Sequence, residues 1–250
     1  MEIPFEITQE EREREYLVVK KNDLVRKARY SLSAQEQKLI LYCISKIKPT
    51  DEEFTDYTFD LKDLCRVCGI SEHGQNYHDF KGAIKRLADK SFWVRTERED
   101  ILCRWLHSVK IYRDETKVSV KLDETLRPYL LQLRENTVRY ELANILAMGS
   151  KYSIRLFEIL QSYSFLGETI ITLEDLRELL QTANYPVWKD FKRRVIEPAL
   201  AEINLYTDIS VSYEVVKAGR AIHALHFTIR KKDLFERMTA SAEKNNVLSR

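Results

Sequence analysis

A short pattern of residues occurs twice in this chain and limits the folds that are open to it. Each copy begins with Leu-x-Asp-Leu, at residues 61–64 and again at 173–176. Each then continues into an apolar-periodic stretch that contains an aromatic residue followed by a lysine, at 80–81 and at 191–192. This spacing predicts a short helix, a turn and a second helix in both places. An internal repeat of this kind indicates two related folding units.

Strands are predicted after the second helix of each copy. In the first copy, apolar residues alternate through 101–111 and 118–122. In the second copy, two alternating stretches at 206–216 and 220–230 flank a turn at Ala218-Gly219. Alternation with a period of two is typical of strands with one buried face. Two helices followed by a hairpin are the ground plan of a winged helix, so the sequence predicts an α+β chain of two tandem winged-helix domains related as an internal repeat.

The segments around the two copies complete the expected domain organisation. We expect a flexible N-terminal arm at 1–15, a first winged helix at 16–135, a second at 136–232 and a C-terminal tail at 233–250. The arm is predicted from its run of mixed charges, which is typical of a solvated segment. The tail has no apolar stripe long enough to require packing, apart from Leu234 and Phe235.

Capping residues and prolines predict where several helices begin and break. Ser33 and Glu36 have the spacing of a capping box at the start of a helix. Thr172 is expected to cap the short helix of the second copy. Pro186 suits the first position of the following helix, and Pro198 is expected to kink or split that helix.

The composition excludes membrane-spanning proteins and leaves DNA binding open. No apolar stretch is long enough to span a membrane, and the N-terminus is acidic, so we expect a cytoplasmic protein without a membrane partner. The 250 residues are 44% hydrophobic, enough for one large core or two of ordinary size. Because the net charge is only +2, a DNA-binding chain of this composition must gather its positive charge on one face.

The four cysteines do not predict a metal site. Cys65-x-x-Cys68 has the spacing of a zinc knuckle, but it lies in a predicted helix, without a second close pair or a histidine at finger spacing. We therefore expect free thiols in a reducing compartment, no metal and no cofactor.

Basic and polar residues gather on the predicted outer face of each second helix. Arg and Lys recognise guanine acceptors in the major groove, and Asn and Gln pair with adenine. The candidate DNA-contacting residues of the first copy are Gln75, Asn76, His78, Lys81, Lys85 and Arg86. Those of the second copy are Lys189, Lys192, Arg193 and Arg194. A solvated face is the plain alternative for any single lysine, but the basic face, the preceding short helix and the following strands occur together twice.

Two further places are expected to contact phosphates of double-stranded DNA. One is near the start of a predicted helix, where free N–H groups and the helix dipole favour an anion; its residues are Ser150, Lys151, Tyr152 and Arg155. The other is the turn between the last two strands, where a wing would meet the DNA backbone. It is flanked by Lys217 and Arg220.

Three stretches carry a resemblance to a known family. They are VVKKNDL at 18–24 with ARYSLS at 28–33, GSKYSIRLFEIL at 149–160, and FKRRVIEPA at 191–199. In this order they resemble iteron-binding plasmid replication initiators of the RepA/RepB/RepE type, over roughly residues 16–232. The resemblance implies two winged helices that bind directly repeated origin sites as a monomer and help to open the duplex for replication.

The resemblance also implies residue roles and partners. By position, Lys189, Lys192 and Arg193 would be the main base-contacting residues, with Lys151 and Arg155 on phosphates; the segment 72–78 matches less closely. Family members dimerise through the N-terminal domain, here expected near 91–122, and in some the dimer represses the initiator's own promoter. Host replication proteins such as a helicase or an initiator are further expected partners.

Two other functions compete with this interpretation. A rolling-circle initiator nicks DNA and needs a His-x-His pair, whereas the nearest approach here, His223-x-x-His226, points to opposite faces of a strand. No G-x-x-x-x-G-K-[ST] loop occurs, so we expect no enzyme and no catalytic residues. A tandem winged-helix transcriptional repressor has the same DNA-binding chemistry. Only the DNA separates it from an initiator, because direct repeats favour initiation and a single inverted repeat favours repression.

Overall fold

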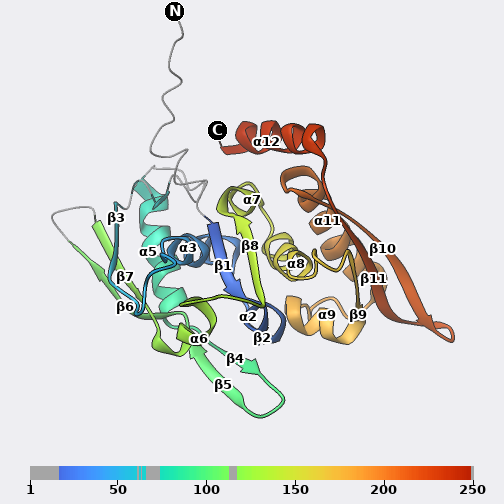
Figure 1. The fold of residues 1–250 in the computed structure, drawn as a ribbon, viewed down its shortest axis with the longest axis horizontal. Coiled ribbons are helices and arrows are strands. Elements are labelled where there is room, and N and C mark those ends of the chain that lie inside the picture. Colours follow the sequence, from blue (N-terminus) through green and yellow to red (C-terminus); the bar gives the residue numbers. More distant parts are fainter. Residues whose placement is uncertain (1–16, 61, 63, 66–73, 113–116, 249–250) are drawn as a thin grey trace, which may run out of the picture.

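The computed structural model describes residues 17–248 except 61, 63, 66–73 and 113–116, with only the backbone of 74–80. The expected arm at 1–15 lies outside these residues. Two winged-helix units lie beside each other along the long axis of the molecule (Figure 1). Within the described chain, no helix is long and apolar enough to cross a membrane.

Within the described residues, the first unit follows the predicted order of helices and strands apart from one added hairpin. Its elements are α3 (Ala34–Ser45), β3 (Tyr57–Asp60), α5 (Gly74–Ala88), β6 (Leu106–Ile111) and β7 (Lys117–Leu122). The three strands form an antiparallel sheet in the order β3-β7-β6. The short helix predicted at 61–67 lies mostly outside the described residues, although Lys62, Leu64 and Cys65 have helical backbone.

The second unit repeats this plan. Its elements are α8 (Lys151–Gln161), β9 (Glu168–Thr172), α9 (Leu173–Leu180), α10 (Trp188–Phe191), the π-helix η2 (Lys192–Ile196), α11 (Glu197–Tyr206), β10 (Ile209–Ala218) and β11 (Ala221–Lys231). In both units, the strand after the first helix pairs with the second strand of the hairpin. The predicted α+β fold of two tandem winged helices is confirmed, and the repeat is visible in the topology.

An additional hairpin interrupts the first unit between α5 and β6. β4 (Ser91–Arg95) and β5 (Asp100–Arg104) pair with each other, and β4 also pairs with β2 (Ala28–Arg29). The prediction of one alternating strand over 101–111 is wrong, because the chain leaves one sheet and enters another at Trp105. Trp105 is buried, and its ring centre lies 4.3 Å from that of Phe92, so it anchors this change of direction in the core.

A two-stranded sheet joins the two units. β1 (Leu17–Lys21) pairs antiparallel with β8 (Thr137–Glu141), which begins just after the domain boundary expected at 135. The domain bounds stay predictions, but the buried residues of both units form one continuous cluster. The remaining connecting helices are α2 (Asn22–Lys27), η1 (Glu124–Leu126), α6 (Arg127–Leu130) and α7 (Leu142–Leu146).

Local capping bonds start two helices where the sequence indicates. The Ser33 Oγ accepts a hydrogen bond from Glu36 N at 3.2 Å, and Ser33 N donates to the Glu36 carboxylate at 2.7 Å, so the capping box is confirmed. The Thr172 Oγ1 accepts from Asp175 N at 3.1 Å, as predicted.

The helix formed by α10, η2 and α11 begins later than predicted and is irregular. Pro186 is not its first residue, because the helix begins at Trp188 after an extended Val187. Within η2, Glu197 N donates to the carbonyl of Lys192, five residues back. Pro198 has no N–H to donate and so interrupts the ordinary four-residue ladder. The irregularity expected at Pro198 is therefore present as a π-helix within a continuous rod rather than as a split.

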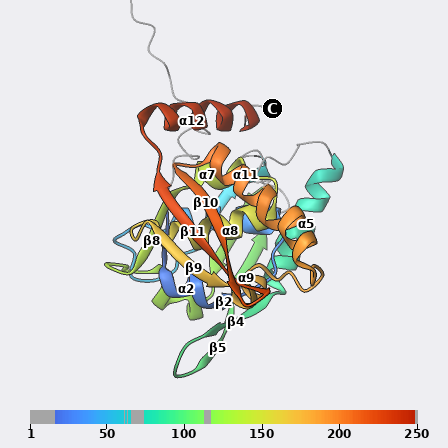
Figure 2. The same cartoon turned by 90° about the vertical axis from the view of Figure 1, so that its right-hand side faces the viewer.

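The C-terminal tail contains a docked helix, α12 (Leu234–Leu248), which lies above α7 and α11 (Figures 1 and 2). Its buried residues are Ala240 and Lys244, and the Lys244 Nζ donates to Asn144 Oδ1 at 2.8 Å. Leu234 and Phe235, which we expected to pack, are 67% and 79% exposed. That prediction is wrong because both side chains lie about 120–140° around the helix from Ala240.

Candidate nucleic-acid interface

The α10–η2–α11 rod, here called the second recognition helix, presents a basic face. Its predicted inner stripe faces the core, with these residues buried or half-buried: Trp188, Phe191, Val195 and Ala199. On the outer side, Lys189, Arg193 and Arg194 are exposed. Lys189 and Arg194 form no hydrogen bond or ion pair with the part of the chain that the structure describes, so both are available to a ligand.

Two other cations on this helix pair with neighbouring carboxylates. The Lys192 Nζ lies 3.2 Å from Glu197 Oε1, and the Arg193 Nη2 lies 3.3 Å from Asp190 Oδ1. The pKa of Lys192 is raised, first because of its hydrogen bond with Glu197. Exposed pairs of this kind contribute little to stability, so an incoming phosphate can replace the carboxylate.

The hairpin of β10 and β11 forms the wing of the second unit and extends away from the body (Figure 1). Gly219 at its tip has a φ of +63°, in the left-handed region that favours glycine. Lys217 and Arg220 flank this glycine and are exposed. The tip therefore presents two cations to solvent, where a wing would meet phosphates.

α5, here called the first recognition helix, has a thinner basic face. Its inner stripe is buried at Ala83, Ile84 and Leu87, as predicted. Lys85 pairs with Asp89 at 3.2 Å, and Arg86 lies 3.6 Å from Glu36. Lys81 is half-buried and has a partner. The other predicted contacts fall on side chains outside the described ones, namely Gln75, Asn76 and His78.

The two recognition helices lie on the same side of the molecule. Figure 1 shows α5 toward one end of the long axis and α11 toward the other. After a quarter turn about the vertical axis, both helices stand on one side of the body (Figure 2). Because a winged helix places its second helix in the major groove, this arrangement lets both helices face one duplex.

The N-terminus of α8 is occupied by a carboxylate of the chain itself. Glu202 of α11 accepts hydrogen bonds from Gly149 N at 3.1 Å and from Ser150 N at 3.3 Å. The Ser150 Oγ accepts from Tyr152 N at 3.1 Å and completes the cap. Contrary to the prediction, the N–H groups of Gly149, Ser150 and Tyr152 are not free for a phosphate, and Glu202 already supplies an anion that the helix dipole favours. Contact of DNA with half-buried Lys151 and Tyr152 stays a prediction.

Arg155 is buried and does not reach the surface. It is 3% exposed, and its Nη2 donates to the carbonyls of Val25 at 2.8 Å and Ala28 at 3.0 Å. Its guanidinium lies 4.4 Å from the centre of the Tyr30 ring. The prediction that Arg155 contacts a phosphate is therefore wrong, because α8 is surrounded by protein at this position.

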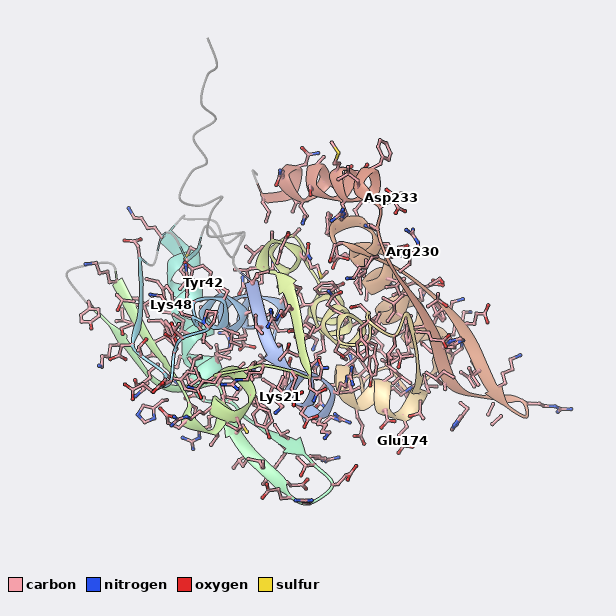
Figure 3. All side chains as sticks on the ribbon, in the orientation of Figure 1. Lys21, Tyr42, Lys48, Glu174, Arg230 and Asp233 are labelled. Carbon is pink, nitrogen blue, oxygen red and sulfur yellow. The ribbon has the colours of Figure 1, made fainter. Side chains whose placement is uncertain are left out.

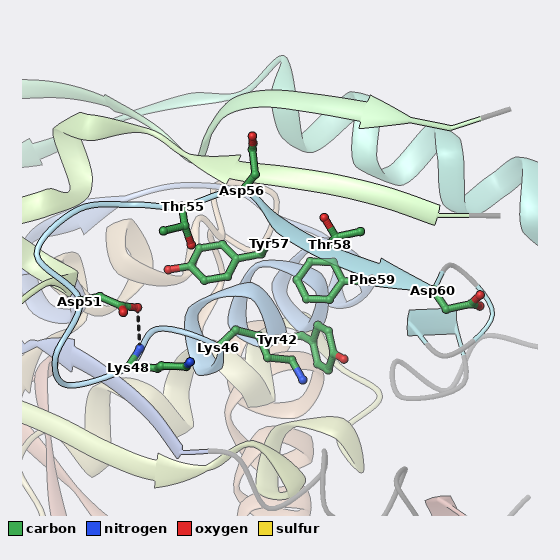
Figure 4. A pocket seen from close by; sticks show the side chains of 10 residues that line it. All are labelled: Tyr42, Lys46, Lys48, Asp51, Thr55, Asp56, Tyr57, Thr58, Phe59 and Asp60. Carbon is green, nitrogen blue, oxygen red and sulfur yellow. Dashed lines mark hydrogen bonds between the residues drawn. The ribbon is translucent and has the colours of Figure 1, made fainter. Parts of the chain in front are cut away.

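A hollow of about 490 Å³ beside the C-terminal end of α3 has a different character (Figure 4). Lys46 and Lys48 lie there among the carboxylates of Asp51, Asp56 and Asp60. Lys48 N donates to the Asp51 carboxylate at 2.8 Å, and the Lys46 Nζ lies 4.4 Å from the Tyr42 ring centre. Because the three carboxylates offset the two amines that line it, this hollow has no excess of positive charge with which to bind a phosphate.

The described residues offer little to a metal ion. Cys43, Cys65 and Cys103 are buried free thiols, and Cys68 lies outside the described residues. Within the described chain, no group of three or more His, Cys, Asp or Glu side chains is placed to hold a metal.

Family models match most of the chain. The model described as "Initiator Replication protein, WH1" matches residues 17–161, and that described as "Initiator Rep protein, WH2" matches 172–229. The chain belongs to the initiator replication protein family. In this initiator replication protein, the first match extends past the boundary expected at 135 and includes β8 and α8.

Two relatives and one solved structure are similar to this initiator replication protein. A "Replication initiation protein" of Escherichia coli is 26% identical over 247 residues, covering 93% of this chain and 76% of that protein. The "PI protein" of Escherichia coli is 28% identical over 186 residues, covering 67% of this chain and 61% of that protein. The crystal structure of Pi initiator protein in complex with iteron DNA shares the fold, with a TM-score of 0.71, 22% identity, and coverage of 88% of this chain and 99% of that one.

Proposed function

We propose that this protein recognises directly repeated duplex DNA at a plasmid origin and promotes opening of the neighbouring duplex. The observation that carries the proposal is the pair of recognition helices on one side of the molecule, of which the second exposes Lys189, Arg193 and Arg194 (Figure 2). A relative of the same fold, the Pi initiator, was solved in complex with iteron DNA, which supports this assignment.

The cations on the second unit have different tasks in this proposal. Arg193 and Lys189 lie four residues apart on one face, and their long side chains suit guanine acceptors in the major groove. Lys217 and Arg220 at the wing tip contact phosphates, which gives affinity without sequence preference. When DNA binds, a base edge or phosphate replaces Asp190 as the partner of Arg193.

Two recognition helices in one chain should enter successive major grooves about 10 base pairs apart. Tandem repeats would then arrange many copies in phase along the origin. Strain from this array would help to melt an adjacent AT-rich segment, where host proteins such as a helicase or an initiator could load. These host partners are part of the proposal.

The proposal also includes a dimer formed through the N-terminal unit. Trp93 and Leu102 are cross-strand partners on β4 and β5, and they are 46% and 49% exposed. β5 is also the edge strand of its sheet, β2-β4-β5. An exposed apolar pair beside an open strand edge supports association with a second copy, in the segment 91–122 where the resemblance led us to expect dimerisation.

Binding measurements on origin repeats test the DNA-recognition part. Arg193→Ala should cost about 1–3 kcal/mol of specific binding free energy. Lys217→Ala should weaken binding to all DNA sequences alike and should reduce the slope of log K against log salt concentration by the contribution of about one phosphate contact. Arg237→Ala, an exposed arginine on α12, is the matched control and should change neither quantity. Equal affinities for wild type and Arg193→Ala would remove this residue from the recognition surface.

Permanganate reactivity tests the initiator part separately. On supercoiled DNA with the host proteins, reactive bases are expected beside the repeats only when this protein is bound. Tight binding without such bases would reject origin opening and favour the transcriptional repressor.

A further inference from the structure

A cluster of buried charged side chains lies where the two winged-helix units meet. α8 contributes Arg155 and Glu158, which are 3% and 1% exposed, and β1 contributes Lys20, which is 1% exposed. Figure 1 shows β1, β8 and α8 next to one another in the middle of the molecule. None of the three side chains belongs to the exposed DNA-binding surface proposed above, so the cluster needs a separate explanation.

The Glu158 carboxylate contacts three other segments of the chain. It forms an ion pair with Lys20 of β1 and accepts a hydrogen bond from the hydroxyl of Tyr140 in β8. Its second oxygen accepts from the Tyr30 hydroxyl at 3.4 Å. Burial lowers the pKa of Lys20, and the charge of Glu158 opposes that shift. The carboxylate of Glu158, in the first helix of the second unit, thus holds β1 and the segment before α3 of the first unit, and it also holds β8.

Arg155 makes the complementary connection. Besides the carbonyls of Val25 and Ala28 in the first unit, its Nε donates to the carbonyl of Leu179 in α9 at 3.4 Å. At the rim of the same junction, Glu178 of α9 lies 3.3 Å from Arg29 and 3.5 Å from Arg95. The first two helices of the second unit, α8 and α9, are therefore both fixed to the first unit by directional polar bonds.

Such a cluster contributes more to the relative orientation of the two units than to the free energy of unfolding. Desolvation of buried ions offsets most of their attraction, so apolar residues of the same volume would often be as stable. An apolar contact permits small rotations, whereas an ion pair with several directional hydrogen bonds is satisfied in one arrangement. Glu202 of the second recognition helix accepts hydrogen bonds from the start of α8. The orientation of α8 therefore also sets the orientation of the second recognition helix.

We propose that Lys20, Arg155 and Glu158 are positioning residues that fix the angle between the two winged helices. Each recognition helix is proposed to bind one half of the DNA site, here called a half-site. The fixed angle then sets the spacing between the two half-sites at which both helices can bind. This inference rests on the proposed DNA recognition, but the fixed angle itself is a property of the free protein.

The test compares spacing preference in wild type and in a variant without the ion pair. Lys20→Met with Glu158→Gln removes both charges, keeps the side-chain volumes and leaves an acceptor for Tyr30 and Tyr140. DNA duplexes carry the two half-sites at the native spacing or with about five extra base pairs, half a helical turn. Wild type should prefer the native spacing by about tenfold or more, and the double variant should lose most of that preference while binding an isolated half-site as wild type does.

Two further variants keep the test decisive if the double variant does not fold. Tyr140→Phe removes one hydroxyl from the cluster and should reduce the spacing preference by about threefold. Tyr129→Phe, a buried tyrosine of α6, is the matched control and should leave the preference unchanged. A wild-type spacing profile in folded Tyr140→Phe or in the folded double variant would overturn the inference.

A measurement without DNA separates this inference from the proposed function. Spin labels at positions 85 and 217, on the first recognition helix and at the wing tip, report the distance between the units. Wild type should give a narrow distribution, and the double variant or Tyr140→Phe a broader one. If the distribution broadens but wild type binds no repeat, the proposed function fails and the positioning role stands. If it does not broaden, the positioning role fails.

Discussion

Replacement of Glu202 by Gln should slightly destabilise the protein and at the same time strengthen its DNA binding. The two carboxylate oxygens of Glu202 accept from Gly149 N at 3.1 Å and from Ser150 N at 3.3 Å. These donors lie at the start of α8, where the helix dipole adds a positive potential. Gln keeps one oxygen acceptor, so the variant loses one hydrogen bond and the negative charge.

The size of the destabilisation follows from the position of Glu202. A carboxylate at a helix N-terminus contributes about 0.3–1 kcal/mol, and a lost capping bond costs about 0.5–2 kcal/mol. Glu202 is half-buried and Gly149 is exposed, so the lower part of these ranges applies. We expect a loss of about 1 kcal/mol, which lowers the Tm by about 2–4 °C for a chain of this size.

The effect on DNA has the opposite sign, because one N–H group is released and the competing negative charge is gone, so a phosphate can bind there. Because the variant loses one negative charge beside this phosphate, the salt dependence of binding should steepen by at most about 0.9 in logarithmic slope. Calorimetry measures the Tm, and fluorescence anisotropy across a salt series measures the slope. Glu135→Gln removes the same charge from an exposed position outside the recognition helices and the wing, and should change neither. An unchanged Tm would show that Glu202 does not stabilise the start of α8, and weaker DNA binding with an unchanged slope would show that no phosphate binds there.

Three shorter predictions concern the exposed apolar pair, the start of α12 and the core beneath the second recognition helix. Trp93→Glu should convert dimers to monomers in sedimentation velocity, because it places a charge on the exposed apolar pair with Leu102; a persistent dimer would exclude that surface. Arg230→Ala should raise the pKa of Glu236 from about 2 toward 4.5, as measured by carbon-13 NMR, because Arg230 holds this carboxylate with two hydrogen bonds of 2.7 Å where β11 passes into α12 (Figure 3). In wild type the stability from this depressed pKa is present above pH 4.5 and is lost as the pH falls toward 2, so α12 should exchange amide hydrogens faster there. Phe191→Ala should cost about 3–5 kcal/mol in chemical denaturation, because its fully buried ring leaves a cavity beneath the second recognition helix; a loss below about 1 kcal/mol would show that the site collapses.

The features that the sequence predicts correctly depend on local spacing. The capping box of Ser33 and Glu36 involves residues three apart, so its bonds form wherever the helix forms. The inner stripe through Phe191, Val195 and Ala199 follows from a repeat of four residues. The same spacing would drift by about 40° per step in a regular α-helix, and the π-helix η2 compensates for part of this drift. The period of the stripe was therefore a signal of the irregular turn as well as of the buried face.

The features that the sequence mispredicts depend on contacts between distant segments. Arg155 lies near a helix N-terminus, and this position indicates a phosphate contact when only the residues close to it in sequence are considered. In the structure its partners are carbonyls of residues 25 and 28, about 130 positions away. One signal was available, because five of the seven residues from 154 to 160 are apolar, and a stretch this rich in apolar side chains is usually buried. Glu202 gave no comparable signal, since its two partners precede it by more than 50 residues.

The unequal charge of the two recognition helices is consistent with a rigid junction between them. Lys85 and Arg86 on the first helix pair with carboxylates, whereas Lys189 and Arg194 on the second are free of such pairs within the described chain. Once the second recognition helix is bound, the fixed angle holds the first recognition helix next to its own groove. Binding of the first helix is then an intramolecular step, in which its effective concentration at the DNA is high. A weakly charged helix then suffices for the second half-site. A chain with a net charge of only +2 can therefore recognise two successive grooves, provided that buried residues and not surface charge hold the two units in place.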